Sequence, residues 1–356
     1  MCCPVRRVLG LCLSLAVVSA VALFAIGADS APGALLLRPD VGLSSDDLAD
    51  AADGDVVVHS LPSDEDGEVA VVGIVRVDVP PAFFIERFRD IATFKKSRRV
   101  SEVGPFGVPP RVEDLAALTI PPGDLRDLRS CRVGDCDVQL PAHTIERFRT
   151  AIDWTSTDAS AEADALFRRV LVEQVEAYFA SGTRALPEYR DQGGSVAVSE
   201  RTREILEASS YLRDHAPAIY QHLDGYQGGW PNGIDEFVYW SKEDLDLKPI
   251  VSLTHVVVRP WEVPGISGYW IASSQIYATH YLSGSLGITG FVEVAGSDGA
   301  RSSYLIYLNR TRTEALGGFL GPIKRAIAGR RARGGMEETL TYARARLQGV
   351  YRQQAD

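Results

Sequence analysis

The chain has 356 residues, of which 46% are hydrophobic and 24% charged, and these are the proportions of an ordinary globular protein. Its 47 acidic and 37 basic residues give a formal net charge of −10 at pH 7, which argues against nucleic acid as a general partner. The length is sufficient for one large domain or two small ones.

The N-terminal segment has the layout of a secretory signal. Arg6 and Arg7 precede an uncharged, mostly apolar run at residues 8–28, and small residues near its end offer cleavage points. The run is also close to the roughly 20 residues that span a bilayer, so an uncleaved anchor is the alternative. Residues 1–28 are therefore predicted to be a signal peptide or a membrane anchor. We expect the protein to be exported, either periplasmic or extracellular, with residues 8–28 as its membrane tether if they are not removed.

Residues 29–66 are predicted to be an acidic linker. Aspartate and glutamate are set there among Ser, Ala, Gly and Pro, and no aromatic residue is present. Such a sequence buries too little apolar surface to order itself. The acidic residues lack the spacing of a calcium-binding loop. The one structural element considered in this segment is a short strand at Val56–Val58.

The folded domain is predicted to span residues 67–356. A strand rich in Val and Ile, Val69–Val79, comes first, and Pro80-Pro81 then suits the first turn of a helix. The apolar stripe of that helix consists of Phe84, Phe88 and Ile91. Gly104 to Pro122 contains five prolines and is predicted to be mostly irregular.

Cys131 and Cys136 are the two cysteines outside the N-terminal segment, and they flank the turn-forming sequence Arg-Val-Gly-Asp. In an exported protein the default for such a pair is a structural disulfide. The alternatives are free thiols or a chemically active pair. Since the C-x-x-C spacing is absent and no further ligands lie nearby in the sequence, the disulfide is the prediction.

A helical block is predicted at about residues 143–224, inserted in the domain. One of its helices carries an apolar stripe and ends at Gly182. The stripe consists of Phe167, Leu171, Val175 and Tyr178.

Five strands follow in close succession. They are predicted at Glu236–Ser241, Ile250–Arg259, Tyr269–Leu282, Ser285–Ala295 and Ser303–Arg312. Their short connections imply an antiparallel meander. An Arg-rich helical tail ends the chain, in two pieces at Phe319–Ala328 and Met336–Tyr351 with Gly334-Gly335 between them. The predicted fold class is α+β, an antiparallel sheet wrapped on a C-terminal helix, with the helical block inserted.

This order of elements resembles the START-like helix-grip superfamily, which includes polyketide cyclases and lipid-transfer proteins. The passage that looks most similar is V-D-V-P-P-A-F-F-I-E-R-F-R-D-I, and the likeness covers Val69–Phe94 and Phe237–Tyr351. The resemblance implies a C-terminal helix lying across a curved sheet, with a hydrophobic cavity between them.

Aromatic residues of the strands are the candidates for lining such a cavity. The ligand-binding candidates are Tyr239, Trp240, Trp270, Tyr277, Tyr281, Phe291 and Tyr304. Aromatic walls with a few hydroxyl groups suit a lipid or another apolar molecule. The alternative is a packed core, because aromatic residues favour strands in any case. Alternate residues of Tyr269–Leu282 share a face, and the sequence does not tell which row faces inward.

His255 and His280 are the candidate catalytic residues. Both lie in predicted strands, and Glu236 and Glu293 stand at ends that they could reach. Two imidazoles with a carboxylate could act as acid and base or hold zinc, but a structural histidine is the commoner case. His222 is placed in a helix and given no role. Since no catalytic, metal or nucleotide motif is present, no metal site and no cofactor are predicted.

The leading hypothesis is an exported lipid-binding or hydrophobic-ligand-binding protein. The alternatives are a cyclase-like or hydrolase-like enzyme that uses the same cavity, and a scaffold domain without a small ligand. A membrane surface is a further candidate partner, because basic residues are gathered at the start of the helical tail. These residues are Lys324, Arg325, Arg330, Arg331 and Arg333.

Overall fold

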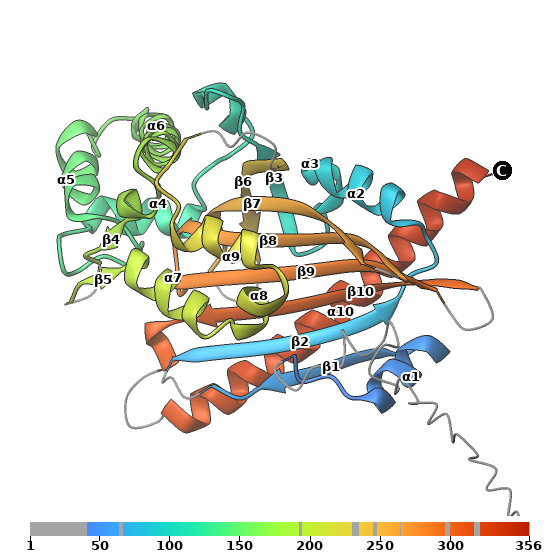
Figure 1. Ribbon diagram of the computed structural model, residues 1–356. Helices are drawn as coiled ribbons and strands as arrows, with labels where there is room; N and C mark the ends of the chain where they lie inside the picture. The colour runs from blue at the N-terminus through green and yellow to red at the C-terminus, as the bar shows by residue number, and fades with distance from the viewer. Residues whose placement is uncertain are drawn as a thin grey trace, which may run out of the picture.

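An eight-stranded antiparallel sheet crosses the molecule, with helices on both of its faces (Figure 1). The computed structural model describes residues 41–63, 67–191, 194–229, 235–244, 248–263, 265–295, 300–316 and 321–355. The predicted signal peptide or anchor at residues 1–28 lies outside the described residues. The predicted α+β class is confirmed, as is a C-terminal helix packed on the sheet.

The strands of the large sheet run in the order β1-β2-β10-β9-β8-β7-β6-β3. Their bounds are β1 Val56–Leu61, β2 Glu68–Arg76, β3 Val100–Pro105, β6 Asp235–Glu243, β7 Ile250–Val263, β8 Ile266–Ala278, β9 Gly284–Ala295 and β10 Arg301–Arg312. The strands from β6 to β10 are neighbours in both sequence and space, as the short connections predict. The second strand, β2, pairs with the last, β10, so strands from the two ends of the domain are neighbours near one edge of the sheet.

Individual residues of β7 and β8 determine how these strands pack and pair with their neighbours. At Gly268 an added Cβ would lie 2.0 Å from the carbonyl oxygen of Phe291 on β9, so no side chain fits there. Further along, the register shifts between Leu253 and Thr254. Because a bulge changes which residues face each side, Ile276 and Tyr277 belong to the same buried cluster although they are adjacent in sequence.

One face of the sheet is covered by α2 (Pro81–Arg89), α3 (Ile91–Phe94) and α10 (Gly321–Ala355), the last lying behind the sheet in Figure 1. Phe84 of α2 stacks on Phe291 of β9, with the ring centroids 4.1 Å apart. Leu340 of α10 packs over Gly73 of β2, where an added Cβ would lie 2.6 Å from the Leu340 Cδ1. The absence of a side chain at Gly73 thus lets the helix approach the sheet closely.

The C-terminal helix is continuous, and the prediction of two pieces separated by Gly334-Gly335 is wrong. Each glycine costs roughly 1 kcal/mol relative to alanine in a helix interior. Burial of Met336, Leu340 and Leu347 against the sheet offsets this cost. Among the described residues, none of the helices combines the length and the apolar character needed to cross a membrane.

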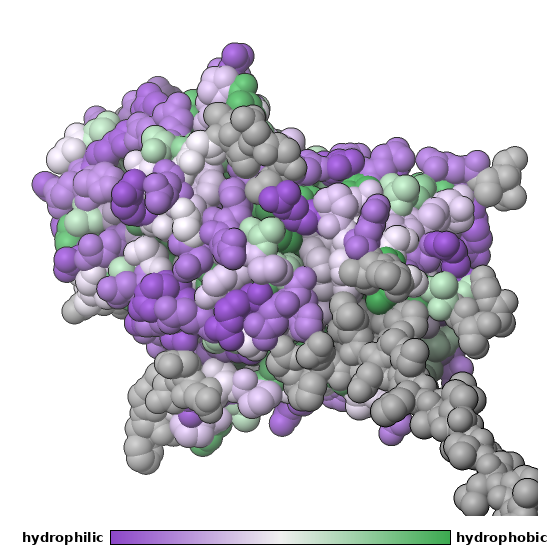
Figure 2. Space-filling model, in the orientation of Figure 1, coloured by the Kyte–Doolittle hydropathy of each residue, from purple (hydrophilic) through white to green (hydrophobic). Residues whose placement is uncertain are grey.

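The other face is covered by two groups of helices. The first group consists of α4 (Pro122–Ser130), α5 (Ala142–Ala151) and α6 (Ala159–Ser181), and the second of α1 (Ser45–Asp53), α7 (Val198–Glu207), α8 (Ser210–His215) and α9 (Pro217–Asp224). The short β4 (Glu188–Tyr189) and β5 (Val196–Ala197) form a separate small sheet. In Figure 2 the outer surface over these helices is largely hydrophilic, since their apolar stripes face inward.

The prediction of an acidic linker at residues 29–66 is wrong for its second half. Ser44 and Asp47 form a capping box that starts α1, so Asp47 helps to begin a helix instead of remaining in a spacer. The strand considered at Val56–Val58 extends to Leu61 and pairs with β2. Two further elements were missed, β3 and α4, and both lie in or near the proline-rich stretch that was predicted to be irregular.

Cys131 and Cys136 form a disulfide in the structure, as predicted, with their Cα atoms 4.5 Å apart. The intervening residues make a tight turn in which Arg132 and Asp135 are bridged. The turn is attached to the segment after β4, because the Cys136 amide donates to the carbonyl of Asp191, 2.8 Å away. The disulfide therefore holds a local turn against the helical block.

The contact of α10 with the sheet gives a test of what stabilises the fold. Leu340→Ala, at a side chain that is 1% exposed, is expected to lower the free energy of unfolding by about 2–5 kcal/mol, because it opens a cavity over Gly73. Ile327→Ala, on the same helix but 50% exposed, is the control and should change it by less than about 0.5 kcal/mol. Urea denaturation of both variants measures the difference, and equal values would contradict this account of the packing.

Candidate functional site

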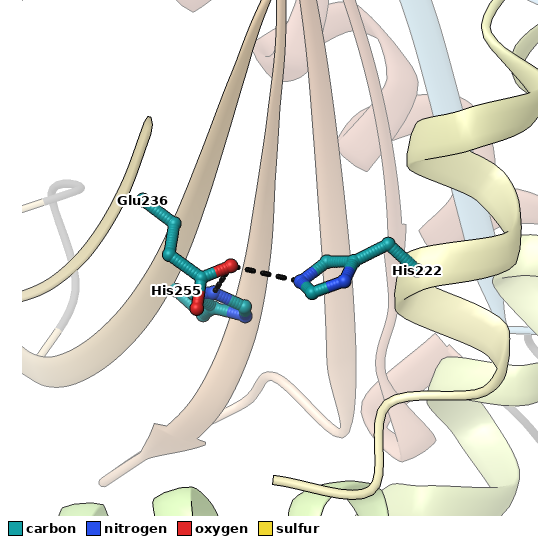
Figure 3. A group of neighbouring side chains, drawn as sticks. All are labelled: His222, Glu236 and His255. Carbon is teal, nitrogen blue, oxygen red and sulfur yellow. Dashed lines mark hydrogen bonds and ion pairs between the residues drawn. The ribbon is translucent and has the colours of Figure 1, made fainter. Parts of the chain in front are cut away.

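Three side chains meet between the sheet and the helices of the second group: His222, Glu236 and His255 (Figure 3). In the β6–β7 register Val238 stands opposite His255 and Glu236 opposite Val257. Glu236 and His255 are therefore diagonal neighbours on one face of the sheet.

The third residue, His222, comes from the last turn of α9. The flanking apolar residues Ile219 and Leu223 belong to the same buried cluster as Val257 of β7. Since residues three and four apart lie on the same side of a helix, this packing holds α9 against the sheet close to Glu236. His222 then reaches the carboxylate from the side opposite to the strands, as Figure 3 shows.

The three side chains are close enough to share one ion. The His222 Nε2 donates to the Glu236 Oε2 at 2.8 Å, and the His255 Nε2 lies 3.4 Å from the same oxygen. One donor atom from each residue lies within 4.8 Å of the others. The His255 side chain is 0% exposed, that of Glu236 3% and that of His222 16%, so the group is screened from solvent except at His222.

Two polar atoms of this group are buried without a hydrogen-bond partner: the Glu236 Oε1 and the His255 Nε2. Leaving a buried polar atom unpaired costs about 1–3 kcal/mol, and more when the group is charged. A structural network would be expected to satisfy such atoms. Both are possible metal ligands. The buried pair of His280 and Asp124 also has polar atoms without a hydrogen bond, so the third ligand, His222, is what separates this group from that pair among the described residues.

Tyr178 of α6 contacts the far side of His255. Its hydroxyl lies 3.0 Å from the His255 Nδ1, and the tyrosine is 3% exposed. This contact fixes the orientation of the imidazole ring, so that its Nε2 faces Glu236. A partner on the second imidazole nitrogen is what orients a metal-binding histidine in known sites.

A second tyrosine, Tyr226, packs against both imidazole rings. Its ring centroid lies 5.1 Å from that of His255 and 5.2 Å from that of His222. Its hydroxyl donates to the carbonyl of Gly229 at 3.1 Å. His255 thus contacts the rings of both Tyr178 and Tyr226, and His222 contacts that of Tyr226, which excludes water from most of the surface of the two imidazoles.

The charges of the group follow from its surroundings. Burial alone would raise the pKa of Glu236, but its contacts with His222 and His255 outweigh this and hold the pKa below its usual value. Burial raises the pKa of Tyr178 well above its usual value, and the pKa of Tyr226 is raised for the same reason. At neutral pH the site therefore presents one carboxylate charge and two neutral phenols.

A pocket of about 360 Å³ adjoins this group. It is lined by Gln221, His222, Gly225, Tyr226, Gln227, Gly228 and Gly229. Gly228 and Gly229 have φ values of 90° and 99°, a conformation that side chains other than glycine rarely adopt. Since His222 and Tyr226 belong both to the pocket wall and to the buried group, a small molecule in the pocket would contact the imidazole edge.

The donor set fits a divalent transition metal. Two imidazoles and one carboxylate are the protein ligands of one class of catalytic zinc site and of non-haem iron sites, and both keep open positions for water or substrate. Ligand atoms about 2.1 Å from a tetrahedral ion lie roughly 3.4 Å from one another. The His255–Glu236 separation of 3.4 Å already matches this value, and the His222–Glu236 hydrogen bond of 2.8 Å would lengthen on binding.

The sequence-based grouping of His255 with His280 is wrong, although its pairing with Glu236 is confirmed. His255 stands opposite Ser274, and His280 lies six residues further along the chain, roughly 15–20 Å away for an extended strand. The His280 Nε2 instead lies 2.9 Å from the Asp124 Oδ1 of α4. Glu293 forms an ion pair with Arg301 on β10. The second imidazole is His222, which the sequence gave no role.

The seven aromatic residues predicted to bind a ligand do not line one cavity. Tyr239 and Phe291 pack on the α10 face of the sheet, whereas Trp240, Trp270 and Tyr277 pack on the opposite face. The ring of Tyr304 also packs on that opposite face, and Tyr281 follows β8 at its end with a φ of 62°. Side chains on opposite faces of a sheet cannot surround the same molecule.

A second pocket, of about 600 Å³, lies between α5, α6 and residues 185–190; we call it the α5–α6 pocket. Its apolar wall includes Leu140, Val170, Leu171, Leu186 and Tyr277. Tyr277 is the one member of the predicted aromatic set that contacts either pocket.

On the α10 face, Lys95 and Glu243 form a half-buried ion pair 3.3 Å apart. The Lys95 Nζ also donates to the Tyr239 hydroxyl at 3.0 Å, and the Ser241 hydroxyl donates to Glu243 at 2.8 Å. Burial opposes both charges, but the mutual attraction lowers the pKa of Glu243 and raises that of Lys95.

This pair predicts a pH dependence of stability. The folded-state pKa of Glu243 lies below its ordinary value of 4.5, so its stabilisation is present above pH 4.5 and is lost as the pH falls through the folded-state pKa. Glu243→Gln is expected to lower the free energy of unfolding by about 1–3 kcal/mol at pH 7 and to reduce its loss as the pH falls below 4.5.

The control is Glu207→Gln, because Glu207 forms an exposed pair with Arg203 and should contribute less than about 0.5 kcal/mol. Denaturant titrations at several pH values measure both variants. An acid profile of Glu243→Gln identical to that of the wild type would contradict the assignment.

No protein-family model matches the chain, and no match was found among the curated proteins or the solved structures. The function is therefore argued from the geometry of the site.

Proposed function

We propose that the protein binds one divalent transition-metal ion through His222, Glu236 and His255 and uses it to activate water for the hydrolysis of a small polar substrate. The observation that carries the proposal is the convergence of three ligand atoms within 4.8 Å of one another in a largely buried group, in which the Glu236 Oε1 and the His255 Nε2 make no hydrogen bond. Zinc is the first choice, because it accepts two imidazoles and a carboxylate and leaves a position for water.

The roles of the surrounding residues follow from their contacts. Tyr178 orients His255 through its Nδ1 and is a positioning residue. His222 and Tyr226 expose the site to the 360 Å³ pocket, and the carboxamides of Gln221 and Gln227 in its wall offer donors and acceptors to a polar substrate. A bound ion would lower the pKa of its water towards neutrality, which is the chemistry that hydrolysis requires.

Metal binding is tested by calorimetric titration of the chelator-treated protein with Zn²⁺. One equivalent is expected to bind, and Glu236→Gln or His255→Gln should weaken the affinity by more than the roughly 10–100-fold that loss of a hydrogen-bond partner of a metal ligand costs. At a free Zn²⁺ concentration 100 times the dissociation constant, the free energy of unfolding should rise by about 2.7 kcal/mol.

The matched control is His280→Gln, because His280 is also buried and paired with a carboxylate, but among the described residues no third ligand joins this pair. It should bind Zn²⁺ as the wild type does. Equal loss of affinity in all variants, or no stoichiometric binding to the wild type, would refute the metal site. Metal binding without hydrolysis of small esters such as p-nitrophenyl acetate would refute only the catalytic part.

A second candidate function is the binding of an apolar molecule by an exported helix-grip protein. Two observations favour it. With α1, β1, the short 3-10 helices and the elements between β3 and β6 set aside, the order of elements is strand, two helices, six strands and a long C-terminal helix, and the first of these strands, β2, lies beside the last, β10. The α5–α6 pocket supplies apolar walls and about 600 Å³, a volume suited to a small ligand.

Native mass spectrometry of the purified protein followed by organic extraction tests the carrier hypothesis. A co-purifying lipid is expected, and Ala177→Trp should reduce it by filling the α5–α6 pocket, since Ala177 lies on its wall. Glu176→Trp, an exposed neighbour on α6 that does not contact the pocket, is the control. An empty wild-type protein would eliminate this candidate.

A further inference from the structure

The first half of α10 carries two large apolar side chains that the sheet does not cover. Ile323 is 60% exposed and Ile327 is 50% exposed. Residues four apart lie on the same side of a helix, so the two form one apolar ridge. Isoleucine is usually buried, and two such residues side by side at the surface indicate a contact with something outside the described chain.

The apolar ridge points away from the sheet. At about 100° per residue, its direction differs by roughly 140° from that of the buried stripe of α10, which consists of Met336, Leu340 and Leu347. The second half of the helix thus attaches α10 to the domain, while the first half presents its ridge to the surroundings. The packing of α10 on the sheet does not require Ile323 or Ile327 to be apolar.

Basic residues flank the ridge on both sides. They are Lys324 and Arg331 on one side and Arg330 and Arg333 on the other, and no acidic residue occurs between Glu314 and Glu337. This concentration of positive charge contrasts with the net charge of −10 of the whole chain. A local basic surface on an otherwise acidic protein favours an anionic partner.

Few of these charges are neutralised within the described part of the chain. Lys324 donates to the carbonyl of Ala315 at 3.1 Å and Arg333 to the hydroxyl of Ser60 at 3.4 Å. Both acceptors are uncharged. No ion pair among the described residues involves Lys324, Arg330, Arg331 or Arg333. Elsewhere on α10 the situation differs, since Glu338 pairs with Arg99 at 2.9 Å.

We propose that this face of α10, from Ile323 to Arg333, docks on the surface of an anionic phospholipid bilayer. The isoleucines enter the boundary between head groups and acyl chains, and the flanking cations bind lipid phosphates. An apolar ridge between two rows of cations suits this occupant, because a purely electrostatic partner such as nucleic acid gives no role to exposed isoleucines. The proposal is independent of the metal site, which lies on the opposite face of the sheet.

Cosedimentation with vesicles tests the proposal on residues 41–356, which contain every described element and lack the apolar run at residues 8–28. The fragment is expected to bind vesicles of phosphatidylcholine and phosphatidylglycerol (3:1) at least tenfold more tightly than phosphatidylcholine alone, and binding should weaken with salt. At about fivefold per charge near the surface, Arg330→Gln with Arg331→Gln should weaken binding roughly 25-fold. Ile323→Ser with Ile327→Ser should weaken it at least tenfold.

The control combines Arg352→Gln, at the far end of the same helix, with Val108→Ser, which removes another exposed apolar residue. Its affinity should equal that of the parent fragment. Absence of vesicle binding, binding that neither double variant reduces, or binding to a DNA duplex in preference to vesicles would each overturn the proposal. Circular dichroism confirms that each variant is folded before its affinity is compared.

Discussion

The register between β6 and β7 is the constraint on which the candidate site depends. It places Glu236 diagonally beside His255 on a single face, and a shift of one residue would send one of the two to the α10 side. β7 is paired on both edges, whereas β6 is paired with β3 only from Tyr239 to Glu243. The position of Glu236 relative to His255 is therefore set by the β6–β7 pairing, and that of His222 by how α9 packs.

The two faces of the sheet carry different groups of residues. The α10 face holds aromatic packing around Phe84 and Phe291, together with the Lys95–Glu243 pair. The opposite face holds the imidazole group beneath α6 and α9 and the pocket next to it. The sheet thus separates the aromatic packing and the ion pair on one face from the imidazole group on the other. Polar atoms left unpaired at Glu236 and His255 can be tolerated because the apolar packing on both faces supports the surrounding backbone.

Much of the sheet could be predicted from the sequence, because its later strands are long, rich in β-branched residues and separated by short connections. Strand β3 was missed because it is short and ends at Pro105, and its place in the sheet depends on pairing with β6. The continuous α10 was missed because local propensity breaks the helix at Gly334-Gly335, whereas packing of Leu340 and Leu347 sustains it. In both cases the secondary structure depends on tertiary contacts, which the local sequence does not show.

The candidate site was only partly predictable for a similar reason. Glu236 and His255 are 19 positions apart in adjacent strands, and alternation along strands is enough to bring them together. Nothing local to His222 indicates that α9 lies over that point of the sheet. Tyr178 was recognised as a buried residue of its helix, and its burial is confirmed, but a stripe of apolar residues gives no sign that its hydroxyl reaches an imidazole.

The pairing of β2 with β10 also governs how the chain can acquire its structure. Ile306 joins Ile74 in the sheet although about 230 residues separate them, so β2 has no inner neighbour until nearly the whole chain has been made. Contacts of such long range slow folding, since a large loop must close before they form. During that interval a valine-rich strand with an open edge is exposed to other chains. The growing polypeptide therefore needs protection from aggregation until its last strand arrives.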